Sequence, residues 1–306
     1  MSASLTKWIT ALILILLLAA LIFWVVLPMA NRNQNENNAE SGSVELINVG
    51  DIEIGYRVSG QGDPLILIMG YGSTMILWEE KLINTLSQQF QVIIFDNRGM
   101  GESTVGEKEF SIEQFSDDTV GLLDALKIEK AHVLGWSMGS YIAQELASRN
   151  PDRVHKLVLY ASVPDPSMFP PAVEVMETLQ DTTGTPEEQG AKWIGLLFPG
   201  QWLANNKERI EEIFYRPLGS INPETIGKQS MAIGKWRGLE ERVANLTHPT
   251  LLIAGEEDIL VPPANSNYLK DQLPNAELKL IEGNGHGLMF QDPDQFLKVV
   301  IGFLKK

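Results

Sequence analysis

The 306-residue chain contains no cysteine. This absence excludes disulfide bonds, thiolate zinc sites, a cysteine nucleophile and lipid attachment through a cysteine. No group of histidines and carboxylates has the spacing of metal ligands, and Gly60-Gln61-Gly62 is too short for a nucleotide-binding loop. We therefore expect neither a metal nor an organic cofactor.

Basic residues are also scarce, with 24 Lys and Arg against 39 Asp and Glu, a net charge of -15 and a pI of about 4.7. Nucleic-acid binding needs clustered Lys and Arg, so this balance argues against a nucleic-acid partner. It argues equally against electrostatic docking on anionic lipid. Such acidity is typical of a soluble surface.

The N-terminal segment lacks charge from Trp8 to Met29 and is rich in Leu, Ile and Ala. About 20 apolar residues suffice to cross a hydrocarbon core as a helix. A cleaved signal peptide usually has an apolar stretch of roughly 7–15 residues and small residues before the cut, and Pro28 is unfavourable there. The pattern favours a transmembrane anchor over residues 1–30, with a signal peptide as the alternative.

The charges beside this segment predict its orientation. Lys7 and the amino terminus are positive, whereas Arg32 is soon offset by acidic residues. The positive-inside rule then places the N-terminus in the cytoplasm and the folded part on the extracytoplasmic side of the lipid bilayer. Residues 31–43 have almost no apolar content and are predicted to form a flexible tether.

The rest of the chain alternates apolar strand-like runs with helical patterns. We expect parallel-sheet strands with apolar side chains on both faces, helices between most of them, and a hairpin at Gly50-Asp51. Strand, helix, strand at this spacing predicts an α/β fold with a mostly parallel sheet and right-handed crossovers. The predicted strands are 44–49, 52–58, 65–69, 92–95, 132–134, 156–160, 250–254 and 278–281, and the predicted helices are 78–89, 111–127 and 137–149.

One long segment, residues 163–247, contains no convincing strand. Helix starts are indicated where a capping residue precedes proline, at Thr185 and Asn222. We expect this segment to form a helical cap over a core made of residues 44–162 and 248–306. Most of its aromatic residues would join the cap to the core, and a few would line a cavity beneath it.

The pentapeptide Gly135-Trp136-Ser137-Met138-Gly139 follows a predicted buried strand and opens a predicted helix. It matches G-x-S-x-G, in which a tight strand-to-helix turn exposes the serine hydroxyl and the glycines let strand and helix cross closely. Ser137 is therefore the candidate nucleophile.

A serine hydroxyl needs a base to take its proton, and the chain has four histidines. His132, His155 and His248 lie at strand entries, away from the carboxyl edge where α/β sites assemble. His286 lies in a glycine-rich loop directly after the last predicted strand. This placement selects His286 as the base.

The base needs a carboxylate to hold its tautomer. Asp258 follows the predicted strand 250–254 and is the preferred candidate, while Asp165 and Glu257 are the alternatives. The chain order of the triad would then be nucleophile, acid, base.

An oxyanion hole would complete an acyl-transfer site. The backbone N–H of Met138 is one expected donor, and the loop of residues 70–73 supplies the second, for which we select the N–H of Tyr71. We further expect Trp136, Trp193 and Phe198 to contact the substrate.

These stretches together resemble the α/β-hydrolase superfamily, in the cap-bearing group of esterases, lactonases and cofactor-free haloperoxidases. The resemblance spans about residues 44–306 and rests on Met69-Gly70-Tyr71-Gly72, DNRGMGES (96–103), GWSMG (135–139), GEEDILVP (255–262) and GNGHG (283–287). It implies an eight-stranded, mostly parallel sheet with helices on both faces and an inserted helical cap. The family often has His at the position of Met69. In the DNRGMGES stretch, Asp96 and Arg98 are expected to fix a turn by pairing.

Serine in place of the Asp nucleophile of dehalogenases and epoxide hydrolases predicts an acyl-enzyme. The leading hypothesis is a membrane-anchored serine hydrolase that cleaves an apolar or amphipathic carboxylic ester. The same triad could serve lactone or C–C bond hydrolysis or perhydrolysis, and a non-catalytic binding protein on this fold is a further alternative.

Overall fold

The computed structural model describes residues 43–181, 183–214 and 220–306. An eight-stranded sheet forms the centre of the molecule, in the order β1-β2-β4-β3-β5-β6-β7-β8. The strands are β1 (Glu45–Val49), β2 (Ile52–Ser59), β3 (Asp63–Ile68), β4 (Phe90–Phe95), β5 (Ala131–Trp136), β6 (Val154–Tyr160), β7 (Thr250–Gly255) and β8 (Ala276–Ile281).

The sheet is mostly parallel. β2 pairs antiparallel with both β1 and β4, and all other neighbours pair parallel. The β1–β2 hairpin turns at Gly50 and Asp51, as the sequence predicts. Every residue of β5 and β7 is buried, because both are interior strands of the sheet and helices cover both of its faces.

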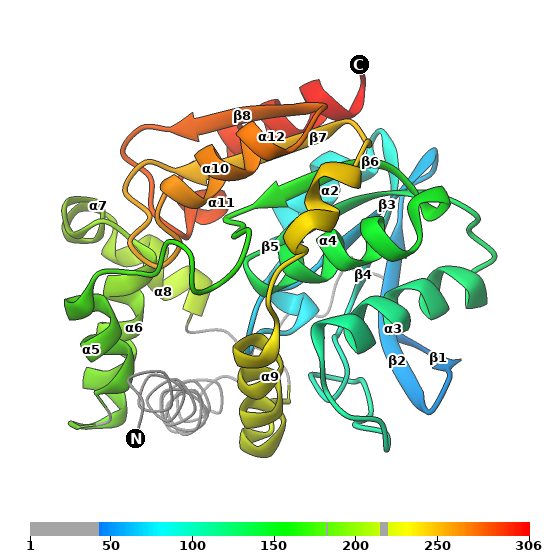
Figure 1. Ribbon diagram of the computed structural model, residues 1–306. Coiled ribbons are helices and arrows are strands. Elements are labelled where there is room, and N and C mark those ends of the chain that lie inside the picture. Colours follow the sequence, from blue (N-terminus) through cyan, green and yellow to red (C-terminus); the bar gives the residue numbers. More distant parts are fainter. Residues whose placement is uncertain (1–42, 182, 215–219) are drawn as a thin grey trace, which may run out of the picture.

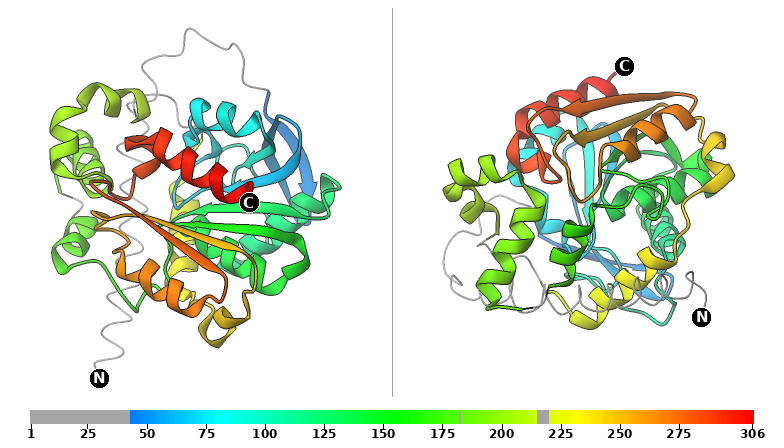
Figure 2. Two further views of the ribbon diagram at one scale, coloured as in Figure 1. Left: turned by 90° about the horizontal axis from the view of Figure 1, so that it is seen from above. Right: turned by 60° about the vertical axis from the view of Figure 1, so that its left-hand side comes forward.

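Two groups of helices cover the two faces of the sheet (Figure 2). α2 (Glu80–Ser87) and α12 (Pro293–Leu304) pack together on one face, and α3 (Ile112–Ala125), α4 (Met138–Arg149) and α10 (Ala264–Gln272) lie on the other. A short helix, α11 (Leu288–Gln291), precedes α12. The prediction of an eight-stranded α/β-hydrolase fold is confirmed.

The described part of the segment between β6 and β7 is helical and contains no strand. Its helices are α5 (Val173–Gln180), α6 (Pro186–Leu197), α7 (Gly200–Asn205), α8 (Lys207–Phe214) and α9 (Pro223–Lys235), followed by a 3-10 helix at Glu240–Asn245. α5 to α8 lie beyond the carboxyl ends of β6 and β8 (Figure 1). The predicted helix starts are confirmed, since the side chains of Thr185 and Asn222 accept N–H bonds from the first turns of α6 and α9.

The predicted membrane location needs correction. Within the described residues, no helix combines the length and the apolar character needed to cross a bilayer. α3 has 14 residues, and at 1.5 Å per residue it covers only about 21 Å of a hydrocarbon core of about 30 Å. The prediction of a membrane-anchored protein with an extracytoplasmic catalytic domain is therefore withdrawn. The anchor predicted for residues 1–30 and nearly all of the tether predicted for 31–43 lie outside the described residues.

Candidate active site

Ser137 occupies a strained turn between β5 and α4. Its φ of 54° and ψ of -122° lie in a backbone region that residues other than glycine rarely adopt. Such strain persists only where the surrounding structure enforces it. Its amide donates to the carbonyl of Tyr160 at 2.9 Å. From Ala131 to Ala147, Ser137 is the only residue that is not buried.

Two glycines allow this turn by removing side-chain bulk. A Cβ on Gly135 would lie 2.2 Å from the carbonyl oxygen of Gly139, and a Cβ on Gly139 would lie 2.1 Å from the carbonyl oxygen of Ile68. Real Cβ atoms do not approach backbone oxygens so closely. The strand and the helix therefore cross at a distance that only glycine permits.

Asp258 and His286 form a buried pair. His286 Nδ1 lies 2.8 Å from Asp258 Oδ2, and the other oxygen, Oδ1, accepts the amides of Leu260 at 2.9 Å and Val261 at 2.8 Å. Both side chains are at most 5% exposed. An ionised carboxylate can only accept, so in such a pair Nδ1 is the donor and the lone pair of a neutral ring lies on Nε2.

The alternative acids are placed differently. Asp165 accepts from the amide and hydroxyl of Ser167 at 2.6 Å, and Glu257 is exposed. Within the described residues, neither carboxylate bonds to His286, whereas Asp258 does. Asp258 is thus the carboxylate that the fold brings to His286.

Tyr160, at the end of β6, connects the serine turn to the histidine loop. Its carbonyl accepts from the Ser137 amide, and its hydroxyl donates to the carbonyl of His286 and accepts from the amide of Met289. Burial raises the pKa of Tyr160 well above its ordinary value, so the hydroxyl stays a donor. Tyr160 was not among the predicted site residues. Its position as an aromatic residue at the carboxyl end of a strand was the only feature of the sequence that pointed to it.

The loop after β3 lies against Ser137. A Cβ on Gly70 would lie 3.2 Å from the Trp136 carbonyl oxygen and 3.4 Å from Ser137 Cβ. Met138 is the first residue of α4, so its amide belongs to the helix start, where N–H groups lack intrahelical partners and the dipole favours negative charge. Tyr71 and Met138, the predicted oxyanion donors, therefore belong to segments that border Ser137.

The three predicted substrate contacts lie around this centre. Trp136 is buried and stacks on Tyr160, with its ring centroid 5.6 Å from that of His286. Phe198 packs so closely on the histidine loop that a Cβ on Gly287 would lie 2.3 Å from its ring. Trp193 and Leu260, which lies two residues beyond Asp258, both pack against the buried cluster of Val175, Leu179 and Leu196.

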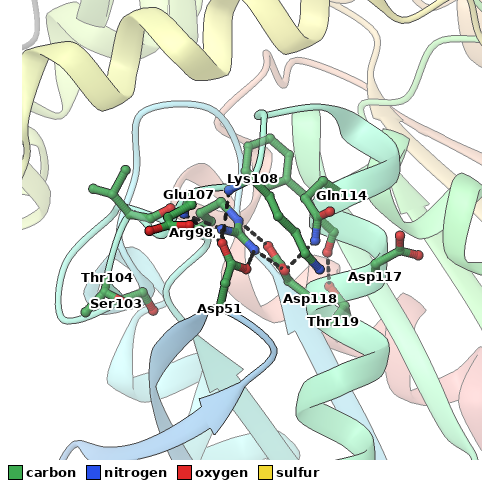
Figure 3. A network of polar contacts seen from close by, with 12 residues as sticks. Asp51, Arg98, Ser103, Thr104, Glu107, Lys108, Gln114, Asp117, Asp118 and Thr119 are labelled. Atoms are coloured by element: carbon green, nitrogen blue, oxygen red, sulfur yellow. Dashed lines mark hydrogen bonds and ion pairs between the residues drawn. The ribbon is translucent and has the colours of Figure 1, made fainter.

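The DNRGMGES stretch forms a network beside the site, but with different pairing from that predicted. Arg98 is fully buried and bonds to Asp51 and Asp118 through both sides of its guanidinium, as Figure 3 shows. These bonds hold the pKa of Asp51 well below its usual range. The predicted Asp96–Arg98 pair is therefore wrong.

Asp96 instead accepts backbone amides from Met75 at 2.6 Å and Glu102 at 2.9 Å. Burial raises the pKa of Asp96 to about 6, although both amide bonds act in the opposite direction. The side chain thus ties the loop after β4 to the segment that follows the loop after β3.

Comparison with known proteins agrees with this geometry. The alpha/beta hydrolase fold family matches residues 63–185 and 198–293. A protein of Caulobacter sp. (strain K31) named putative carbamate hydrolase RutD is 31% identical over 245 residues, which cover 78% of this chain and 90% of that protein.

Solved structures are also similar. A hydrolase from Pseudomonas aeruginosa PA01 has a TM-score of 0.74 and 26% identity, covering 87% of this chain and all of that one. A meta-cleavage product hydrolase from Pseudomonas fluorescens IP01 has a TM-score of 0.74 and 25% identity, covering 85% and 97%. The sheet order, the serine turn and the matches to known proteins all indicate the same family. The chain belongs to the α/β-hydrolase family and is a hydrolase.

Proposed function

We propose that the protein is a serine hydrolase that cleaves a carboxylic ester through an acyl-enzyme, with Ser137 as nucleophile, His286 as base and Asp258 as the acid that orients it. The observation that carries the proposal is the buried Asp258–His286 bond, held beside the strained Ser137 turn by Trp136 and Tyr160. A cofactor has no role in the proposed reaction.

The chemistry follows from these groups. His286 Nε2 takes the proton of the Ser137 hydroxyl as the oxygen attacks the ester carbonyl, and Asp258 stabilises the resulting imidazolium. The imidazolium then protonates the departing alkoxide, which leaves as the alcohol. Water, deprotonated by His286, attacks the acyl-enzyme; the bond to the Ser137 oxygen then breaks, the carboxylic acid leaves, and His286 returns the proton to that oxygen.

The charge that develops on the carbonyl oxygen needs hydrogen-bond donors already in position. We assign this role to the backbone N–H groups of Met138 and Tyr71. The proposal is supported by the start of α4 at Met138 and by the contact of Gly70 with Ser137. Loss of one such donor typically lowers kcat by about 10²–10³-fold.

We further propose that residues 163–247 form a cap on a core of residues 44–162 and 248–306. An apolar or amphipathic acyl group would lie beneath it, near Trp193 and Phe198, with Trp136 supporting the base. The packing of Phe198 on Gly287 supports this placement, as does the packing of Trp193 and Leu260 on one buried cluster.

The experiment measures p-nitrophenol release from acetate, butyrate and octanoate esters by the full chain and by Ser137→Ala. We expect a loss of at least about 10³-fold in the variant. Ser116→Ala, at a buried serine on α3 whose hydroxyl has no hydrogen-bond partner among the described residues, is the matched control and should stay within about twofold. Equal rates in Ser137→Ala and the parent protein would sink the proposal.

A carbamate is the second candidate substrate, because the similar Caulobacter protein is named a putative carbamate hydrolase. Attack on a carbamate carbonyl needs the same three side chains. Rates on p-nitrophenyl acetate and p-nitrophenyl N-methylcarbamate, measured side by side, decide between the two. A higher kcat/KM for the carbamate would replace the ester assignment, and a panel with a lactone and a C–C substrate completes the comparison.

A further inference from the structure

Helix α9 reaches the loop that borders Ser137 through two consecutive residues. The Gly72 amide donates to Gln229 Oε1 at 2.9 Å, and the Ser230 hydroxyl donates to the Tyr71 hydroxyl at 2.6 Å. These bonds join segments 157 and 159 residues apart in the chain. Two neighbouring loop residues are thus held by two neighbouring helix residues.

Apolar and backbone contacts extend the same junction. Tyr71 packs on the buried cluster of Met100, Ile221 and Ile226, of which Ile226 belongs to α9. The Gly101 amide donates to the carbonyl of Ser220 at 2.9 Å, two residues before the Asn222 cap of the helix. The start of α9 therefore packs on the loops after both β3 and β4.

Gln229 is an unusual choice for a side chain that only fills space. It is fully buried, and its Nε2 has no hydrogen-bond partner within the described structure. Leaving a buried polar group unpaired costs about 1–3 kcal/mol, a cost that a leucine or methionine would avoid. The orientation of the amide is fixed, because only its oxygen can accept the Gly72 N–H.

The loop itself needs an external constraint. Gly72 has a φ of 65°, and glycines on both sides of Tyr71 give this backbone many accessible conformations. The bond from Gly72 to Gln229 selects one of them. A displacement of about 1 Å at a catalytic donor can cost about 10²-fold in rate.

We propose that Gln229 is a positioning residue that sets the backbone of the loop 70–73, so that the Tyr71 N–H reaches its place beside Ser137 only while α9 is docked on the loop. This inference rests on the proposed function for the role of that N–H. The bond between Gly72 and Gln229 is itself independent of the reaction.

The test compares Gln229→Met, which keeps the volume and loses the acceptor, with Gln229→Glu, which keeps an acceptor oxygen. We expect Gln229→Met to lower kcat on the best p-nitrophenyl ester by about 10–100-fold, with KM within about threefold, and to slow labelling of Ser137 by a fluorophosphonate. Gln229→Glu should regain at least part of kcat. Amide exchange of residues 69–74 should be faster in Gln229→Met than in the parent protein.

Gln144→Met is the matched control. Gln144 is a fully buried glutamine on α4 whose Nε2 donates to Ser162 Oγ and to the Val163 carbonyl, both at 2.9 Å. Its replacement should lower Tm without changing kcat or the exchange of residues 69–74. An equal fall of kcat in both Met variants would overturn the positioning role.

The remaining outcomes are separable. Unchanged exchange at Gly72 in Gln229→Met, or faster exchange with an unchanged kcat, overturns the inference while the proposed function stands. Failure of Ser137 in the parent protein to react with the fluorophosphonate overturns the proposed function, and the inference with it.

Discussion

At the scale of single residues, Asp258 uses both of its carboxylate oxygens. One faces His286, and the other accepts two backbone amides from the turn that follows β7. The turn therefore fixes the carboxylate independently of the histidine. A carboxylate whose rotation is restricted in this way can hold the imidazole in one orientation.

Asp258→Asn should leave the fold intact and lower kcat by about 10²–10⁴-fold, because an amide can hold the histidine in the wrong tautomer. Steady-state kinetics on the best ester measures the effect. Asp165→Asn is the matched control at the competing aspartate and should behave like the parent protein. A larger loss in Asp165→Asn would reverse the assignment.

His132 is a buried histidine outside the site, and its ring packs against Phe90 with a centroid distance of 6.0 Å. Burial lowers its pKa from 6.5 to about 4, and nearby His155 and Lys156 act in the same direction, while Asp63 opposes them. Between these two pH values the unfolded chain binds a proton that the folded chain does not bind. This group's stability contribution is therefore complete above pH 6.5 and is lost as pH falls through about 4.

His132→Phe should remove this part of the acid destabilisation. The loss of unfolding free energy between pH 7 and pH 5, measured by urea titration, should be smaller in the variant by about 1–2 kcal/mol. Identical pH dependence in both proteins would show that the buried ring does not carry the effect.

The partners of Arg98 show where residue-level prediction stops. The motif indicates that Arg98 fixes a turn, but its partners Asp51 and Asp118 lie 47 and 20 residues away. They meet only because the β1–β2 hairpin and α3 pack against the same loop. The local pattern suggested the nearer Asp96, which the backbone amides of Met75 and Glu102 occupy instead.

At the scale of elements, the crossing of β5 and α4 determines where Ser137 lies. The predicted helix 137–149 is observed as Met138–Arg149, and the predicted strand 132–134 as Ala131–Trp136. Short apolar runs and the glycine spacing were sufficient to predict these two elements, because both signals lie within a few residues of sequence. The contact of Gly139 with the end of β3 is a long-range packing contact, and no local pattern reveals it.

Gly135→Ala should destabilise the fold by at least about 2–3 kcal/mol, because its Cβ would collide with the Gly139 carbonyl. Thermal and urea unfolding measure the loss. The matched control is Gly195→Ala in α6, where no described atom beyond the adjacent residues and the backbone of the same helix lies within 4 Å of the added Cβ. That substitution should be neutral or stabilise the protein by up to about 1 kcal/mol.

At the scale of the whole molecule, ion pairs fasten the helices between β6 and β7 to the rest of the protein. Arg209 of α8 pairs with both oxygens of Glu79 at 2.6 and 2.7 Å, and Arg242 pairs with the fully buried Glu145 of α4 at 2.9 Å. Glu145 also accepts from Trp236 Nε1. The helical segment is thus held at points far apart in its sequence.

A double-mutant cycle of Glu79→Gln and Arg209→Met should give a coupling energy of about 0.5–1.5 kcal/mol, since one guanidinium nitrogen contacts both carboxylate oxygens but the pair is partly exposed. The coupling should shrink in 1 M salt. Urea unfolding of the four proteins measures it, and a coupling of zero at low salt would contradict the fastening role.

The mostly parallel sheet and the alternation of strand and helix could be predicted from the sequence, because buried parallel strands have a simple composition. The docking of α9 could not be predicted. Its hydrogen bonds to the loop 70–73 are made by Gln229 and Ser230, polar residues on an amphipathic helix, where polar side chains usually face solvent. The membrane location inferred from the apolar N-terminus was wrong, as the described helices are too short or too polar to cross a bilayer.

The pairing of β6 directly with β7 has an evolutionary consequence. Leu157 pairs with Thr250, so the whole helical segment leaves and re-enters the sheet between adjacent strands, and its replacement leaves every strand pair in place. A lineage could exchange this segment as a module and acquire a new specificity without rebuilding the sheet. A replacement segment would, however, need a side chain that accepts a hydrogen bond from the Gly72 amide, as Gln229 does. That amide therefore restricts which segments this sheet can accept.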